Sequence, residues 1–357
     1  MAAFSTIPSS TRVNCNTTRA IINPDAYIGR NSMQRQDNLR VLDLFQSSFM
    51  DDIKKPQILD VGCGTGDFTR DHLLPRCPDV ERIVAVDISQ DMVEFAREHF
   101  AHPKIRYDVF DISRHDMTEF VERYGQFDRV YSFFCLSWTN DQETALKNIE
   151  ELLKPGGGCL LLFTATSSIM RLRKKLSSID HWQKYRKMIE YSFPPSVDLV
   201  SRDALLSYIS GLLKKTSLIP TTCEVLQVTH TYSSFDELAQ MHMSLNRLSN
   251  LVPKEEKPLL LKDVTENAAR LWAEKEAGGS PFCSSMFLAT FCQRRRRTHI
   301  KKAAASVDGG SSKRRCVGVT PGYRERESLK ESAIRRSLLY LLCSSFRIFD
   351  LEFSGKS

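Results

Sequence analysis

Short apolar runs alternate with amphipathic stretches along the first half of the chain. Each run has the length of a buried strand, and the segments between them carry apolar residues at helical spacing. The predicted strands span residues 58–61, 81–88, 104–112, 127–134 and 159–164. Strands that alternate with helices in this way predict an α/β fold built on a parallel, doubly wound sheet.

The segments between these strands carry helix signals. The predicted helices span residues 25–49, 67–74, 90–100 and 141–153. Ser89 is suited to cap the third of them because its hydroxyl can accept a backbone N–H of the first turn. The sequence Lys154-Pro155-Gly156-Gly157-Gly158 is predicted to stop the fourth helix in a turn.

Helical periodicity dominates after Thr164. It predicts one long helix, basic on one face, over residues 167–191. Further helices are predicted at residues 198–215, 235–248 and 257–275, and strands at residues 223–232 and 285–292. The second half of the chain is therefore expected to add both helices and strands to the first.

Positive charge is concentrated near the end of the chain. Residues 293–357 hold 16 Lys or Arg against 6 Asp or Glu, whereas residues 1–292 hold 34 against 37. Because residues 1–292 are close to neutral, their charge does not require nucleic acid as a partner. Residues 293–357 are interpreted as a basic low-complexity tail, either a solvated linker or a nuclear-localisation signal.

Residues 1–22 are rich in Ser and Thr and contain no acidic residue. A disordered N-terminal extension is the favoured interpretation, with a transit peptide as the alternative, and no signal-peptide apolar region is present. No stretch supplies the roughly 20 apolar residues that a membrane span requires. The protein is therefore expected to be cytoplasmic.

The ten cysteines show no C-x-x-C pair and no spacing typical of metal ligands. Several lie in apolar runs, as Cys135 and Cys159 do. Free thiols in a reducing compartment, and no metal site, are expected from this usage.

A glycine-rich turn follows the first predicted strand. Residues 57–66 read Gln-Ile-Leu-Asp-Val-Gly-Cys-Gly-Thr-Gly, with glycine at positions 62, 64 and 66. A strand that passes through such a turn into a helix places a nucleotide-like ligand at the carboxyl edge of an α/β sheet. The alternative is a tight turn with no ligand. The spacing is D-x-G-x-G-x-G, which differs from the dinucleotide pattern G-x-G-x-x-G.

Acidic residues stand at the ends of three successive predicted strands. Asp60 precedes the glycines, Asp87 ends the second strand, and Asp111 ends the third. A carboxylate at the second position can accept hydrogen bonds from ribose hydroxyls, and one at the third can accept from an adenine amino group. Each acid alone is typical of a solvated strand end. Together, beside one glycine loop, they favour an adenosine-bearing ligand.

Taken together, these residues resemble the class I S-adenosylmethionine-dependent methyltransferases, over about residues 25–292. The resemblance implies a Rossmann-like methyltransferase domain at residues 23–292, with a seven-stranded, mostly parallel sheet in the order 3-2-1-4-5-7-6. The strand at residues 285–292 would be antiparallel, and helical lid additions would occupy about residues 165–218 and 234–276. A sulfonium cation also suits a loop edged by Asp60 and Asp67, whereas a pyrophosphate does not.

On this resemblance the cofactor is S-adenosylmethionine. The implied cofactor-binding residues are Asp60, Gly62, Cys63, Gly64, Gly66, Asp87, Ile88, Asp111, Ile112 and Ser132.

Two further segments resemble the juvenile-hormone-acid O-methyltransferases. These are residues 26–37, which include Asn31-Ser32-Met33-Gln34-Arg35-Gln36-Asp37, and residues 133–142, which include Leu136-Ser137-Trp138-Thr139-Asn140. The match places Gln34 and Trp138 where that family holds the carboxylate of its substrate. Ser137 stands where the family pattern has His, a departure that bears on the identity of the acid and on activity.

The implied reaction is the direct in-line transfer of a methyl group to a small hydrophobic carboxylic acid. A carboxylic acid with a pKa near ~4 to 5 is already ionised at neutral pH and needs no general base. Gln34 and Trp138 are neutral donors, suited to orienting a carboxylate. Without the resemblance, Trp138 would be interpreted as core and Gln34 as a surface residue.

Other functions stay open at this point. The acceptor is alternatively a small polar acid, a quinone carbon or an RNA recruited by the basic tail, although the charge balance makes nucleic acid the less favoured partner. A non-catalytic cofactor-binding protein is the alternative from another class. The sequence leaves the acid and the oligomeric state undetermined.

Overall fold

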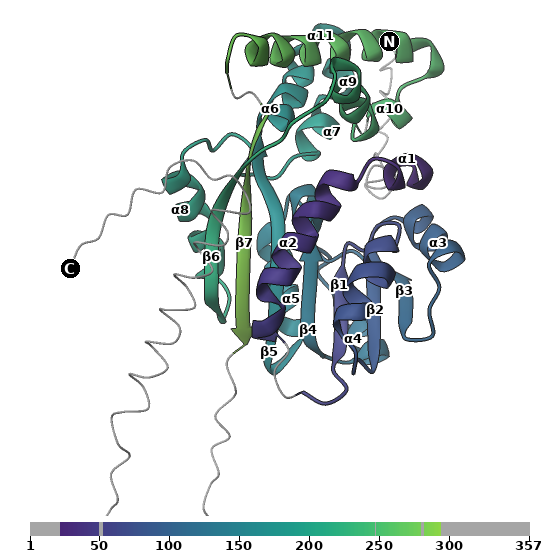
Figure 1. The fold of residues 1–357 in the computed structure, drawn as a ribbon, viewed down its shortest axis with the longest axis vertical. Helices are drawn as coiled ribbons and strands as arrows, with labels where there is room; N and C mark the ends of the chain where they lie inside the picture. The colour runs from purple at the N-terminus through teal and green to yellow at the C-terminus, as the bar shows by residue number, and fades with distance from the viewer. Residues whose placement is uncertain (1–21, 50–52, 247, 280–281, 294–357) are drawn as a thin grey trace, which may run out of the picture.

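The computed structural model describes residues 22–49, 53–246, 248–279 and 282–293. These residues form a seven-stranded sheet in the order β3-β2-β1-β4-β5-β7-β6, and β7 runs antiparallel to both of its neighbours (Figure 1). The strands are β1 Gln57–Val61, β2 Arg82–Asp87, β3 Ile105–Val109, β4 Phe127–Phe133, β5 Leu153–Ser167, β6 Leu218–Thr229 and β7 Cys283–Gln293. The expected fold class, strand order and antiparallel strand are confirmed.

Helices cover both faces of this sheet (Figure 1). They are α2 Ser32–Phe49, α3 Gln90–His99, α4 Thr118–Tyr124, α5 Gln142–Leu152 and α8 Arg202–Leu213. Neighbouring strand residues serve opposite faces because side chains alternate along a strand. Leu59 packs in the core that α4, α5 and α8 share, whereas Ile58 packs in the core that α2 and α3 share. The sheet is therefore doubly wound, as the alternating pattern predicts.

A helical cap lies over the carboxyl ends of the parallel strands (Figure 1). It comprises α6 Ser168–Lys174, α7 Arg186–Tyr191, α9 Phe235–Ser244, α10 Leu248–Leu251 and α11 Lys257–Glu276. Two apolar clusters of its own hold the helical cap together, one around Trp182 and Leu260 and the other around Leu238 and Leu271. The short helix α1 Pro24–Ile28 leads into α2 beneath it.

The chain from residue 167 to 191 is divided into short pieces, so the single long helix predicted there is wrong. The pieces are α6, the 3-10 turns Lys175–Ser178 and Asp180–Tyr185, and α7. Ile179 is extended between the two turns, with φ −85° and ψ 128°. At about 100° per residue, Leu176 and Trp182 would point about 120° apart on one straight helix. Both are buried in the same cluster, so the chain has to turn between them.

Several other boundaries differ from the predicted ones. β3 ends at Val109, so Asp111 lies in the turn after the strand. The predicted turn at residues 154–158 is a bulge inside β5, because Leu153 pairs with Phe127 and the next paired residue is Gly158. The helix predicted at 67–74 contains the π-helical turn Thr69–Leu73, and α4 was not predicted.

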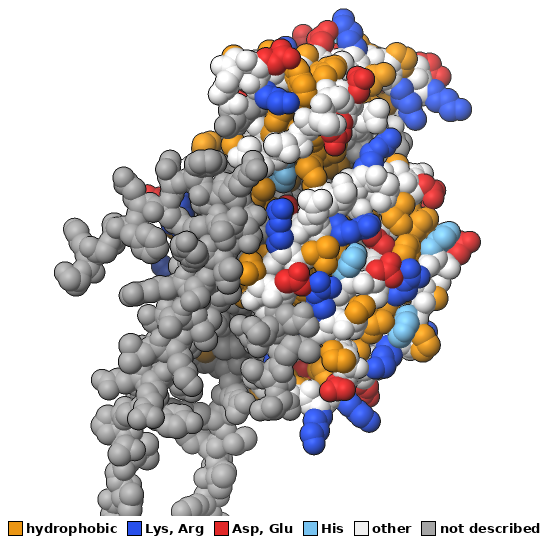
Figure 2. Space-filling model, in the orientation of Figure 1, with side chains coloured by type: hydrophobic (Ala, Val, Ile, Leu, Met, Phe, Trp, Pro, Cys, Tyr) orange, Lys and Arg blue, Asp and Glu red, His pale blue; other side chains and the backbone are white. Residues whose placement is uncertain are grey.

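Charged side chains of both signs are intermixed on the face of the described residues that Figure 2 shows. Residues 294–357 of the predicted basic tail and residues 1–21 of the predicted N-terminal extension lie outside the described residues, whereas Gln293 is the last residue of β7. On this face the described charges are not separated into large patches of opposite sign.

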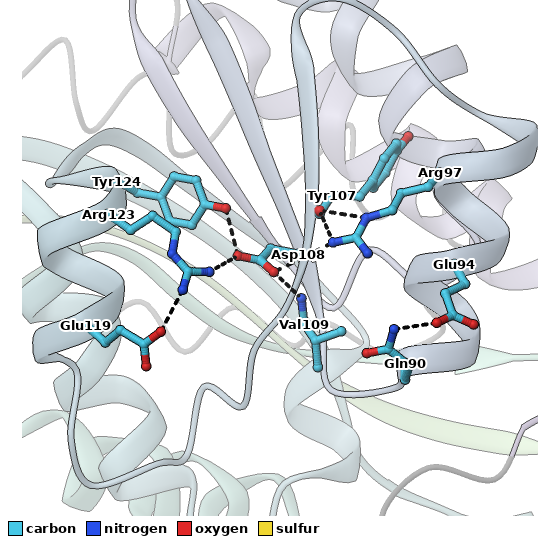
Figure 3. Close-up of polar contacts among 9 residues, drawn as sticks. All are labelled: Gln90, Glu94, Arg97, Tyr107, Asp108, Val109, Glu119, Arg123 and Tyr124. Atoms are coloured by element: carbon cyan, nitrogen blue, oxygen red, sulfur yellow. Dashed lines mark hydrogen bonds and ion pairs between the residues drawn. The ribbon is translucent and has the colours of Figure 1, made fainter.

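One carboxylate ties the edge strand β3 to helices on both faces of the sheet (Figure 3). Asp108 accepts hydrogen bonds from the Arg123 guanidinium at 2.8 Å and from the Tyr124 hydroxyl at 2.7 Å, both on α4. Arg97 of α3 lies 3.7 Å from the same carboxylate and donates to the Tyr107 carbonyl at 2.8 Å. Partial burial opposes the effect, but these hydrogen bonds hold the pKa of Asp108 below its ordinary value.

Asp108→Asn is expected to lower the free energy of unfolding by about 1–2 kcal/mol at about pH 7, because it weakens two charge-assisted hydrogen bonds. A group with a lowered folded pKa stabilises the protein above its unfolded pKa, and that stabilisation is lost as the pH falls through the folded value. The difference from wild type should therefore shrink as the pH falls below the ordinary pKa of Asp, about 3.9, as measured by urea unfolding. The exposed Asp79→Asn serves as control. A difference that is constant with pH would contradict this account.

Candidate active site

The carboxyl ends of the central strands enclose a cavity of about 150 Å³, called here the loop cavity. The predicted cofactor residues that line it are Gly62, Gly64, Asp87, Ile88, Asp111 and Ile112. Trp138 lines it as well, from the 3-10 turn Cys135–Trp138 that follows β4. The sheet therefore gathers at one edge residues that the sequence distributes over several segments, since the carboxyl ends of parallel strands meet there.

The Asp87 carboxylate is fixed in place by the backbone on either side of it. Its Oδ2 accepts the Gly64 N–H at 3.0 Å, and its Oδ1 accepts the Ser89 N–H at 2.9 Å. Burial raises the pKa of Asp87, although these N–H groups act in the opposite direction. Each oxygen keeps a further lone pair, so an oriented acceptor stands at the wall of the loop cavity.

The two isoleucines and Asp111 form a different part of the same wall. Asp111 Oδ1 accepts the backbone N–H of Ser113 at 2.9 Å and its hydroxyl at 2.6 Å, which fixes the turn after β3. Ile112 is buried, whereas Ile88 is 38% exposed. An exposed large apolar side chain beside a cavity provides surface that a flat apolar ligand can cover.

Two glycines allow the chain after β1 to pass very close to its neighbours. A Cβ on Gly62 would lie 2.4 Å from the Cβ of Cys135, and one on Gly66 would lie 2.7 Å from the Cβ of Ala96. Both glycines also have positive φ, +83° and +78°. Gly62 therefore brings the backbone to the loop cavity, whereas Gly66 lets the loop pack on α3, away from the residues that line this cavity.

Three other predicted cofactor residues lie behind the loop. Asp60 Oδ2 accepts the Thr69 hydroxyl at 2.6 Å, and burial raises the pKa of Asp60 to about 6. Asp60 and Cys63 line a smaller cavity of about 40 Å³. The Ser132 hydroxyl donates to the Val61 carbonyl at 3.1 Å, which joins β4 to β1. Their roles in binding stay predictions.

A second large cavity, of about 110 Å³, lies under the helical cap and is called here the cap cavity. Gln34 and Trp138 both line it, so two residues from distant segments do meet. The surface of this cavity is more apolar than polar, and its apolar side chains include Met33, Ile169, Met170, Met241, Leu245 and Met286. Trp138 also lines the loop cavity, as do Tyr27 and Phe134, so these three aromatic residues form the boundary between the two spaces.

α2 is held against the glycine loop by the Asp67 carboxylate. Arg35 of α2 pairs with Asp67 Oδ2 at 2.5 Å and with Asn31 Oδ1 at 3.0 Å. The Thr65 hydroxyl donates to Asp67 Oδ1 at 2.5 Å. This ion pair fixes the helix that carries Gln34, whose side-chain Oε1 is buried with no hydrogen-bond partner among the described residues.

Ser137 stands where the family pattern has His, and its side chain holds two segments of the protein together. Its side chain is buried and its hydroxyl accepts the Thr164 backbone N–H at 2.8 Å. The turn that carries Trp138 is thereby fastened to β5. Ser137 also lines the cap cavity.

Three residues that line these cavities were not expected from the sequence. Tyr27 lines both cavities, and burial together with the charges of Asp67 and Asp87 raises the pKa of its hydroxyl. Phe134 has φ 60°, a left-handed conformation that bulky residues rarely adopt. Arg173 is a buried cation in the wall of the cap cavity. Tyr27 and Phe134 belong to segments that carried the family resemblance, but no sequence signal marks Arg173.

The described residues contain no helix that combines the length and the apolar character needed to cross a membrane. Among the same residues, no three or more His, Cys, Asp or Glu side chains are grouped as metal ligands would be. Cys63, Cys77, Cys135, Cys159, Cys223 and Cys283 are free thiols.

Comparison with known proteins identifies relatives of this chain. The profile of the methyltransferase domain family matches residues 58–157. Juvenile hormone acid O-methyltransferase of Drosophila melanogaster is 36% identical over 172 residues, which are 47% of this chain and 57% of that protein. The enzyme of the same name from Bombyx mori is 28% identical over 246 residues, 69% of this chain and 84% of that protein.

A third relative is a malonyl-[acyl-carrier protein] O-methyltransferase of Acetivibrio thermocellus, 32% identical over 173 residues, 48% of this chain and 55% of that protein. The chain thus spans little more than half of the Drosophila and Acetivibrio proteins and most of the Bombyx protein. The resemblance drawn from the glycine loop and its acids is confirmed: residues 58–157 match the methyltransferase domain family, and the chain is similar to the juvenile hormone acid O-methyltransferases.

Proposed function

We propose that this protein is an S-adenosylmethionine-dependent O-methyltransferase that forms the methyl ester of a hydrophobic carboxylic acid. The observation that carries the proposal is the wall shared by the two cavities. Gln34 and Trp138 line an apolar cavity, and Trp138 also lines the cavity of Asp87 and the glycine loop. Relatives whose names specify O-methylation of an acid or an acyl-carrier protein support the same reaction.

The loop cavity fits the adenosine part of this cofactor. In the proposed arrangement, the fixed Asp87 carboxylate accepts hydrogen bonds from the ribose hydroxyls. Asp111 accepts from the adenine amino group, while Ile88 and Ile112 cover the faces of the ring. Gly62 provides the close backbone approach that a Cβ would prevent. When bound, the cofactor supplies a methyl group activated by its positively charged sulfur.

The charges around the glycine loop favour a cationic donor. Asp60, Asp67 and Asp87 all lie close to this segment, and the pKa values of neighbouring groups record their combined field. Burial and then the nearby carboxylates raise the pKa values of Tyr27 and Cys135. A negative potential of this kind stabilises a sulfonium and disfavours a phosphate-bearing ligand.

The cap cavity fits an apolar acid. Its Met, Leu and Ile side chains give a carbon chain surface to bury, at about 25 cal/mol per Å². In the proposal, the Gln34 amide and the Trp138 indole hold the carboxylate at the boundary with the loop cavity. An oxygen held in this way would be oriented to accept the methyl group that the cofactor would supply when bound. Alignment of this kind supplies up to ~7–11 kcal/mol in the best intramolecular cases.

The apolar lining favours this acceptor over a small polar acid, and the near-neutral charge of residues 1–292 does not favour RNA. The proposal also includes a methyltransferase domain at residues 23–292. A cytoplasmic location is part of it as well, since free thiols are typical of a reducing compartment.

The reaction is tested by incubating the purified protein with S-adenosylmethionine labelled in its methyl group and a panel of farnesoic-type, fatty and short polar acids. A labelled ester is expected with the hydrophobic acids. Gln34→Ala and Trp138→Phe should each lower kcat/KM by about 10- to 100-fold, because each removes a hydrogen bond to a charged oxygen.

Matched controls are the exposed Gln183→Ala, and Trp272→Phe, whose indole donates to Glu276 rather than lining either cavity. Both controls should keep wild-type rates. Absence of ester with every acid, or equal losses in the control variants, would argue against the proposed acceptor site.

Asp87→Ala is expected to weaken the binding of S-adenosylhomocysteine by about 10- to 100-fold, because it removes the proposed acceptor for the ribose. Isothermal titration calorimetry measures the change. The exposed Asp91→Ala, four residues further along the chain, is the control and should bind as wild type does. Unchanged affinity in Asp87→Ala would remove the loop cavity from the cofactor assignment.

A further inference from the structure

Arg173 is a buried cation whose charge the protein itself leaves uncompensated. The residue lies on α6 and is 7% exposed. Its Nη1 donates to the Leu245 carbonyl at 3.4 Å, but Nε and Nη2 have no hydrogen-bond partner among the described residues. A guanidinium stays protonated and carries five N–H donors, so burying it without a counter-ion is costly.

The groups around Arg173 do not provide that counter-ion. Burial lowers the pKa of Arg173 to about 10, and the Tyr232 hydroxyl is the group that acts against this change. Burial, with Arg173 as the second cause, lowers the pKa of His242 to about 3, so this imidazole is neutral. Neither ring nitrogen of His242 and neither N–H of the Asn246 amide has a partner among the described residues. Unpaired donors thus gather here around an unpaired positive charge.

Arg173 lies in the wall of the cavity that the proposed substrate would occupy. It lines the cap cavity together with Gln34 and Trp138. It also lines a small cavity of about 20 Å³, again together with Trp138. Arg173 and Trp138 are therefore common to two cavities, one of them very small, which places them close to each other.

Arg173 is the one Lys or Arg among the described residues that line the cap cavity. The other ionisable lining groups are Asp37, His230 and two tyrosines. Burial lowers the pKa of His230, so it adds no positive charge near neutral pH. An anionic ligand in this cavity therefore has a single cationic side chain to pair with.

We propose that Arg173 is the counter-ion of the substrate: it pairs with the ionised carboxylate in the cap cavity and makes the site select acids over neutral alcohols and esters of the same carbon skeleton. The identity of this anion rests on the proposed function. The carboxylates around the glycine loop repel an incoming acid, and the Arg173 charge offsets that repulsion within the apolar cavity.

The pairing also distinguishes substrate from product. The acid enters as an anion, and the ester that forms is neutral, so the ion pair exists with the substrate and not with the product. Because the negative charge diminishes during methyl transfer, Arg173 stabilises the bound acid more than the transition state. Arg173 therefore lowers KM for the acid and favours release of the neutral ester, while Gln34 and Trp138 orient the carboxylate oxygens.

The test compares the binding of farnesoate and dodecanoate with that of farnesol and dodecanol, using the full-length protein and equilibrium dialysis without methyl donor. Wild type should bind each acid at least about tenfold more tightly than its alcohol. Arg173→Met should lose about 10- to 100-fold in acid affinity and keep its alcohol affinity, and Arg173→Lys should recover part of the loss. In turnover, Arg173→Met should raise KM for the acid with kcat unchanged or higher.

The control is Lys175→Met, an exposed cation two residues away whose loss changes net charge equally. Wild-type affinity for S-adenosylhomocysteine in every variant shows that the fold is intact. Arg173→Met should also melt at a higher temperature than wild type without ligand, since it removes an unpaired buried charge. Equal losses for acid and alcohol, or unchanged acid affinity in Arg173→Met, would overturn the inference.

Failure of the proposed function has a different signature. If acids bind in an Arg173-dependent way but receive no methyl group, Arg173 is the counter-ion and the proposed reaction is refuted. If Arg173→Met instead forms the ester and binds the acid as tightly as wild type does, the proposed reaction stands and Arg173 is not the counter-ion.

Discussion

The carboxyl edge of the sheet depends on how closely the chain leaving β1 approaches its neighbours. Gly62 lies against Cys135 and Gly66 against Ala96, both at separations that leave no room for a Cβ. This approach lets the Gly64 N–H reach the Asp87 carboxylate and lets Asp67 reach α2. The walls of both cavities follow from it, because α2 carries Gln34 and the turn after β4 carries Cys135 and Trp138.

The two cavities differ in the charged groups that line them. Carboxylates surround the glycine loop, whereas the cap cavity contains the unpaired guanidinium of Arg173. Tyr27, Phe134 and Trp138 separate them with aromatic surface. A cationic donor and an anionic acceptor would each meet a complementary field here, and their reacting ends would face each other across the aromatic boundary.

The features that could be predicted from the sequence are those encoded by short stretches of the chain. The strand order came from the family resemblance, and the placement of Asp87 at a strand end came from an apolar run and its terminal acid. Residues 167–191 were mispredicted because Leu176 and Trp182 share a core that only the folded chain brings together. The burial of Arg173 is likewise a tertiary property, since Leu245, whose carbonyl accepts its hydrogen bond, lies 72 residues away in sequence. The gathering of the glycine loop, Asp87 and Asp111 at one edge of the sheet could therefore be predicted from the sequence, whereas the buried charge of Arg173 could not.

The position of β7 has a consequence for how this sheet is completed. β5 pairs on one edge with β4, and its other edge pairs with β7, whose partner for Ser167 is Ser284. Residues 168–282 therefore have to be synthesised before the long second edge of β5 gains its partner. During translation that edge is an open ladder of unpaired N–H and C=O groups, the kind of surface that recruits other strands. The order of strands that completes the methyltransferase sheet thus also sets the interval in which the nascent chain is most exposed to aggregation.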